Sequence, residues 1–142
     1  MNGTAGSVAF PLAVDDPLEL FPLHLAESRG VSAVPIRKLH ELAKTIRSKN
    51  AGVDKITFDV IFRDRDTYDA VLRAHVLTRE TIAALYYIAD SRSPDFVEYD
   101  SGCAIKFAIY RDRPSVSPGD PDIFGAQQYA PLLDIEAPIT TM

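Results

Sequence analysis

Two short segments of this sequence carry side chains that suit ligand binding. The first is the run Gly125-Ala126-Gln127-Gln128-Tyr129, which follows a dense cluster of turn-forming residues at 115–122. The second is Arg47-Ser48-Lys49-Asn50. Because binding sites commonly form on long loops that hold polar groups in place, we expect the two segments to converge on one site.

The segment at 47–50 offers two cations and two neutral hydrogen-bonding groups. Arg47 presents a planar fork to a carboxylate or phosphate, whereas Lys49 presents a point charge. A turn at Gly52 would add backbone N–H donors that help to hold an anion. The alternative is a solvated helix end, where basic residues meet the helix dipole favourably. The substrate-binding candidates here are Arg47, Ser48, Lys49 and Asn50.

The loop segment offers amides, carboxylates and a phenol. Gln127 and Gln128 do not titrate, so they would either position a substrate or tie down the loop. Asp120 and Asp122 are candidates for catalysis or for a hard cation, although both are also ordinary turn residues. Tyr129 is a candidate weak acid or oxyanion donor, with ring packing as the alternative.

No recognised catalytic or metal motif accompanies these residues. The sequence has no Gly-rich phosphate loop, nucleophile elbow or zinc-ligand pattern, and its three histidines are scattered. Cys103 alternates with apolar residues, which predicts an inert buried thiol in a strand. The sequence therefore requires no metal or cofactor.

Apolar spacing predicts the elements that hold these segments. Residues 39–46 fit one helix face, so we expect a helix from Pro35 to the stop signals at Asn50 and Gly52. A short strand through residues 41–45 is the alternative. Alternation predicts a strand over residues 56–62.

The second half of the chain shows helix caps followed by strands. Asp64 or Asp66 is expected to cap one helix, and Thr78 another, with Leu77 and Ile82 as a hydrophobic staple. Residues 96–99 and 103–109 predict a hairpin, and residues 133–137 a last strand that ends at Pro138.

This order of elements predicts an α+β fold, a two-layer sandwich with a small, mostly antiparallel sheet. Residues 1–34 are interrupted by Gly, Ser and Pro, so we expect an N-terminal extension that is flexible or laid over a partner. Residues 35–142 are expected to form a single α+β domain.

Composition narrows the classes of partner. The chain has 142 residues, 46% of them hydrophobic, and a formal net charge of −5. This charge argues against nucleic acid or an anionic membrane as partner, because both reward a basic surface. A single cysteine and the lack of a membrane-spanning apolar run lead us to expect a cytoplasmic protein.

Four segments carry a resemblance to a known family: LAKTIRSKNAG, TFDVIF, VLTRETIA and SPGDPDIFGAQQYAPLLDIE. From about Leu39 to Pro138 the chain resembles small bacterial proteins known only as the domain of unknown function numbered forty-three eighty-seven. Tyr129 stands where that family often has His.

Such proteins are typically encoded beside AtuA-like (acyclic terpene utilisation) proteins, and the chain is similar to the small ferredoxin-like domain attached to them. The resemblance implies a ferredoxin-like domain with helices on one face of its sheet. It also implies an accessory subunit of a larger AtuA-like enzyme of acyl-CoA or organic-acid metabolism, inactive alone, in which Arg47, Lys49, Asn50 and Gln127 meet a carboxylate or CoA phosphate. The alternatives are a free-standing lyase or hydratase that uses the same loops and a structural homo-oligomer without ligand.

Overall fold

The computed structural model describes residues 33–89 and 95–140. From Val34 onwards these residues belong to one compact unit of the chain. The expected extension, except for its last two residues, lies outside the described part. The elements in chain order are β1 (Ile36–Lys38), α2 (Leu39–Leu42), β2 (Ala43–Ala51), β3 (Lys55–Phe62), α3 (Arg65–Arg73), α4 (Arg79–Leu85), β4 (Asp95–Tyr99), the 3-10 helix η3 (Asp100–Gly102), β5 (Ala104–Tyr110), the 3-10 helix η4 (Ala130–Asp134) and β6 (Glu136–Pro138).

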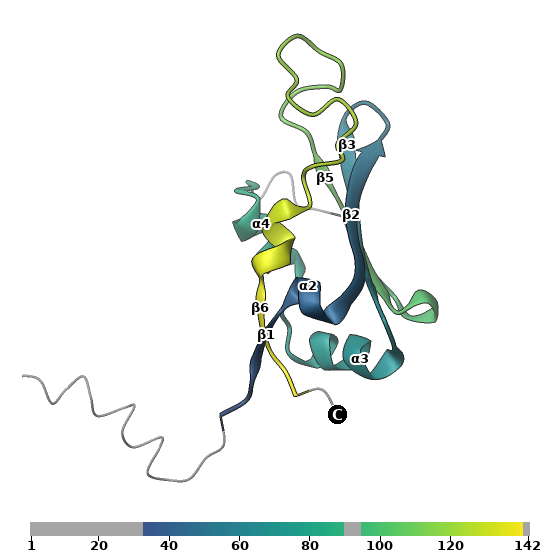
Figure 1. Ribbon diagram of the computed structural model, residues 1–142. Helices are drawn as coiled ribbons and strands as arrows, with labels where there is room; N and C mark the ends of the chain where they lie inside the picture. The colour runs from purple at the N-terminus through teal and green to yellow at the C-terminus, as the bar shows by residue number, and fades with distance from the viewer. Residues whose placement is uncertain (1–32, 90–94, 141–142) are drawn as a thin grey trace, which may run out of the picture. The chain divides into compact units, whose positions relative to one another are not determined.

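The main sheet is antiparallel, with strand order β2-β3-β5-β4, and β1 pairs with β6 in a second small sheet (Figure 1). Val71 of α3, Ile82 of α4 and Leu132 of η4 share one core with Phe58 and Val60 of β3. The helices thus cover one face of the main sheet, which confirms the predicted α+β sandwich. Two hairpins bracket α3 and α4, an order that differs from the βαββαβ order of ferredoxin-like domains.

Local signals specified the central elements correctly. The strand predicted at 56–62 is β3, and the hairpin predicted at 96–109 is the β4–β5 pair. The Asp64 side chain accepts a hydrogen bond from the Thr67 amide (2.8 Å) and caps α3. Thr78 caps α4, with Leu77 and Ile82 both buried beside it. These predictions are confirmed.

The helix predicted from Pro35 to the stop signals at Asn50 and Gly52 is wrong except for one turn, because Ile36–Lys38 form the strand β1 and only Leu39–Leu42 are helical. α2 has only four residues, and β2 then runs from Ala43 to Ala51 as the edge partner of β3. Ile46 suits both the helical and the strand period, so pairing with the buried strand β3 decides the structure. Gly52, with φ of 76°, belongs to the β2–β3 turn and not to a helix end.

Two predictions near other strand ends also need correction. Only Glu136–Pro138 forms the last strand, because Leu133 lies in η4, the 3-10 helix that buries Leu132. Cys103 is not a buried strand residue: it is half-buried and precedes β5 with φ of 47°, where the η3 turn reverses the chain.

Candidate functional site

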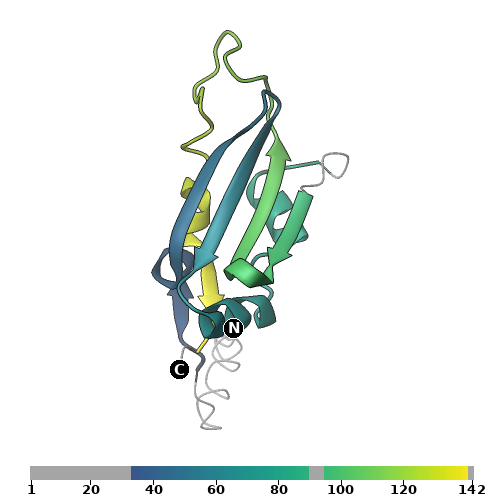
Figure 2. The ribbon, with the colours of Figure 1, turned by 90° about the vertical axis from the view of Figure 1, so that its right-hand side faces the viewer.

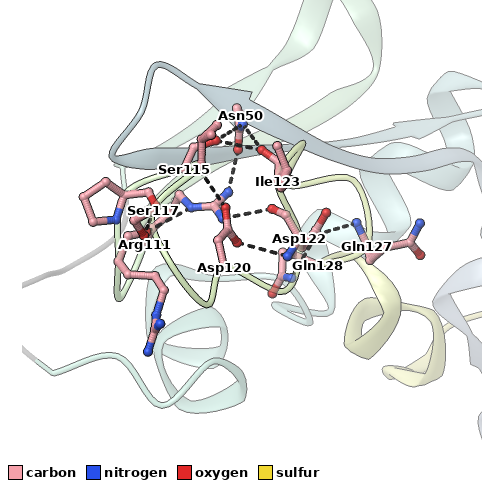
Figure 3. Close-up of polar contacts among 12 residues, drawn as sticks. Asn50, Arg111, Ser115, Ser117, Asp120, Asp122, Ile123, Gln127 and Gln128 are labelled. Carbon is pink, nitrogen blue, oxygen red and sulfur yellow. Dashed lines mark hydrogen bonds and ion pairs between the residues drawn. The ribbon is translucent and has the colours of Figure 1, made fainter.

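The chain between β5 and η4, residues 111–129, is a long loop without helix or strand, hereafter the site loop. Its centre is Arg111, whose side chain is only 6% exposed and pairs with the 1% exposed carboxylate of Asp120 (2.6 Å). The guanidinium also donates to Asn50 Oδ1 (2.6 Å) and to the carbonyls of Asp122 (2.9 Å) and Arg113 (3.2 Å) (Figure 3). One buried cation therefore joins the loop to β2.

Both aspartates of the loop bind the loop itself. Asp120 accepts from the amides of Val116 (2.9 Å) and Asp122 (3.0 Å), besides Arg111. Asp122 accepts from the amides of Ala126 (3.1 Å) and Gln127 (2.9 Å) and from the Gln128 side chain (3.0 Å). Every carboxylate oxygen of the pair accepts at least one hydrogen bond from within the protein, so both carboxylates hold the loop in place.

Ser48 and Asn50 of β2 complete the network. The Asn50 side chain donates to the Ile123 carbonyl (2.7 Å) and to Ser115 Oγ (3.0 Å), and the Asn50 backbone amide donates to the Phe124 carbonyl (2.9 Å). The buried Ser48 hydroxyl donates to the Gly125 carbonyl (2.7 Å). The prediction that the two polar segments meet is thus confirmed for these two β2 residues.

Hydrogen bonding sets the charge state of the loop carboxylates. Amide hydrogen bonds, chiefly from Asp122, hold the pKa of Asp120 below its usual range, with help from the Arg111 charge. Burial pushes the pKa of Asp122 upward, but hydrogen bonds from Gln128, Gln127 and Ala126 outweigh it, and the net shift is also downward. At neutral pH both carboxylates are ionised.

These shifts predict that the site loop loosens in acid. A carboxyl whose pKa is lowered on folding stabilises the fold above its unfolded pKa, and that stability disappears as the pH falls through the folded pKa. We therefore expect the Ala126 and Gln127 amide proton resonances to titrate with a midpoint below the usual Asp pKa of 3.8. A titration midpoint at or above that value in an NMR pH series would contradict the network.

A cleft of about 360 Å³ lies beside the network. Its apolar wall contains Tyr86 and Ile88, and its polar wall contains Arg111, Asp120 and Gln128. The Tyr86 hydroxyl donates to the Gln128 carbonyl (2.8 Å), and burial raises the pKa of this phenol, so it stays protonated. The volume is at the lower end for small-molecule pockets.

Arg47 and Lys49 do not join this site. Side chains alternate along β2, so these two residues point away from the loop that Ser48 and Asn50 contact. Arg47 instead binds Asp59 of β3 through Nε (2.8 Å). The expectation of one site made from all four residues is therefore wrong, although a binding role for Arg47 and Lys49 stays a prediction.

The remaining candidates have separate positions. Gln127 is exposed and contributes its backbone amide, while its side chain points out of the network (Figure 3). Tyr129 is half-buried and packs against the core beside η4. Arg111, the centre of the network, was missed, because a single arginine after a strand is no motif.

Within residues 33–89 and 95–140, no cluster of three or more His, Cys, Asp or Glu side chains is placed to hold a metal ion. The same part of the chain contains no helix long and apolar enough to cross a membrane.

Comparison with known proteins identifies the family. The model of the family described as Domain of unknown function (DUF4387) matches residues 39–136, so the chain belongs to this family. No curated protein and no solved structure matched the chain.

Proposed function

We propose that this DUF4387 protein is a non-catalytic accessory subunit, whose site loop docks on a larger AtuA-like enzyme of acyl-CoA or organic-acid metabolism. The observation that carries the proposal is how the site loop distributes its side chains. Its polar groups bind one another, while large apolar side chains remain exposed to solvent. Val116 is 71% and Phe124 75% exposed. Exposed apolar groups of this kind mark protein-binding sites when they are clustered.

These apolar groups belong to segments that hydrogen bonds hold together. The Ser115 amide donates to the Val53 carbonyl (2.8 Å), which attaches the site loop to the β2–β3 turn, and the Asn50 amide holds the Phe124 carbonyl. We call Val53, Val116, Ile123 and Phe124 the loop tip; Val53 is 60% and Ile123 46% exposed. Val116 has φ of 67°, unusual for a β-branched residue, and such strain is commonly kept at functional positions. A loop fixed before binding loses little conformational entropy when it docks.

Acid–base chemistry by the loop alone is disfavoured by the same contacts. A general base works best with a pKa near the operating pH. The Asp120 and Asp122 pKa values are shifted away from neutrality, and their oxygens already accept hydrogen bonds from the loop and from Arg111. Catalytic groups would therefore come from the larger subunit. The resemblance to proteins encoded beside AtuA-like proteins supports this class of partner.

The cleft favours one second candidate, a free-standing lyase or hydratase with a small ligand against Arg111 and Tyr86. Its volume permits a small acid. This enzyme would turn over acyl-CoA or hydroxy-acid substrates without the larger protein, whereas the accessory subunit would not.

A co-purification experiment with a matched pair of variants tests the accessory role. Phe124→Ser should weaken the complex with the AtuA-like protein by about 2 kcal/mol, roughly thirtyfold in Kd, because it removes an exposed aromatic anchor. Tyr87→Ser, which alters another highly exposed aromatic at the end of α4, should leave Kd unchanged. Turnover by this chain alone, or equal loss of affinity in both variants, would refute the proposal.

A further inference from the structure

The main sheet has a second face that no described helix crosses (Figure 2). Strand alternation places Asp59 of β3, Arg47 of β2 and Lys106 of β5 in one row across this open face. The face carries four cations against two carboxylates at its paired positions, an excess of positive charge on a chain whose net charge is −5. The open face is thus a local basic surface.

Asp59 organises the centre of this surface. Its side chain is only 4% exposed and accepts from Arg47 Nε (2.8 Å) on one oxygen and from Lys106 Nζ (2.6 Å) on the other. The two cations are themselves 55% and 44% exposed. Within the described residues, the Nη groups of Arg47 make no hydrogen bond. The buried carboxylate therefore holds two cations side by side with donors left over for an incoming anion.

Apolar side chains adjoin the cations. Val97 lies opposite Lys106 on the neighbouring strand and is 54% exposed, and Tyr99 of the same strand is 48% exposed. Ala104 of β5 is paired with Tyr99 and is buried. The open face thus combines an apolar strip on β4 with a cationic row across β2, β3 and β5.

We propose that the open face binds an amphipathic helix of a partner protein, with an apolar stripe on Val97 and Tyr99 and an acidic side chain on Arg47 and Lys106. The backbones of β3 and β5 are paired on both sides, so the partner must satisfy its own backbone groups, as a helix does. The surface is separate from the loop tip, and the inference goes beyond the accessory role.

Charge decides between this occupant and two others. A second copy packed face to face would bring two surfaces of excess positive charge together, which opposes self-association here. Nucleic acid has no apolar stripe to cover Val97, and its many phosphates would meet the net negative charge of the chain. An acidic helix meets the cations and carries the apolar stripe that β4 requires.

The test uses the full chain and two labelled synthetic helices, one with a Leu stripe flanked by Glu and one with Lys in place of Glu, read by fluorescence anisotropy. The Glu helix should bind at least about tenfold more tightly than the Lys helix, and added salt should reduce the preference. Lys49→Glu and Arg47→Glu should each weaken Glu-helix binding about tenfold. The Lys49 side chain makes no hydrogen bond or ion pair within the described residues, so this variant tests the charge without disturbing Asp59.

Arg73→Glu on the helical layer is the charge-matched control and should bind normally, as should the loop-tip variant Phe124→Ser. Phe124→Ser is expected to weaken the complex with the AtuA-like protein. If this variant still binds the Glu helix, the open face acts independently of the loop tip. Equal affinity for the two helices, failure of the Glu helix to bind, or tighter binding of single-stranded oligouridine would each overturn the proposal.

Discussion

Replacing Arg111 by Met should release the site loop while the sheet stays folded. The substitution removes the partner of a buried carboxylate and three further hydrogen bonds. Removing one member of a buried ion pair typically costs roughly 3–5 kcal/mol, because the other charge is left without compensation. Since a loop can open locally, we expect the loss to approach the lower end of that range.

Amide hydrogen exchange would locate the effect. The amides of Val116 and Asp122, which donate to Asp120, should exchange at least about a hundredfold faster in Arg111→Met. Core amides such as that of Phe58 in β3 should keep most of their protection, since the sheet hydrogen bonds remain.

Arg113→Met is the matched control. Arg113 is exposed and donates to the Pro118 carbonyl (3.0 Å). Its replacement by Met therefore removes the same charge from the same loop without leaving a buried carboxylate unpaired. We expect a change within about 0.5 kcal/mol. If both variants lose the same stability, the buried ion pair does not hold the loop.

The parts of the fold that were predictable have local causes. Alternation over residues 56–62 can be satisfied by one buried strand, and Asp64 and Thr78 satisfy the first amides of the helices that follow them. β2 has a different cause. The residues of β2 could also form a helix. They form a strand because they pair with the edge of β3, which lies outside their own segment of the sequence.

The candidate site also has parts that local sequence predicts and parts that only the folded structure reveals. Sequence reasoning named Asn50 and Gln128 as substrate-binding candidates and Asp120 as a catalytic candidate, and the structure places all three in one network. It did not identify Arg111, because residue type alone does not reveal which charge lies beneath a loop. The network supports one of the two interpretations of the Gln-rich run, because the Gln128 side chain and the Gln127 backbone amide bind Asp122 and so fix the loop.

The sequence pattern predicted a helix at residues 47–50, so it could not predict that alternate residues of β2 point to opposite faces of the sheet. On a helix, neighbouring residues from 47 to 50 would project around the axis and could share a ligand. On a strand, Arg47 and Ser48 point to opposite faces. The basic open face and the site loop therefore became separate surfaces, each with its own experiment.

Gly125→Ala should cost more stability than any other single-methyl change in the loop. Gly125 has φ of 66°, and an added Cβ would lie 2.6 Å from Asn50 Oδ1 and 3.1 Å from the Asn50 amide nitrogen. A left-handed alanine costs roughly 1–2 kcal/mol. Overpacking against β2 should add about 1–3 kcal/mol. The Asn50 side chain cannot easily move aside, because its amide group is hydrogen-bonded to Arg111, Ser115 and Ile123.

Gly52→Ala separates these two contributions. Gly52 also has positive φ, 76°, but an added Cβ would meet nothing within 4 Å, so only the backbone cost applies. In an Asn50→Ala background, where the colliding oxygen is gone, the added cost of Gly125→Ala should fall toward that of Gly52→Ala. Denaturant unfolding of the original chain, Gly125→Ala, Asn50→Ala and the double variant measures the coupling, and Gly52→Ala gives the backbone cost. Equal costs at the two glycines, or no coupling to Asn50, would mean that contact with β2 does not determine why glycine is needed at 125.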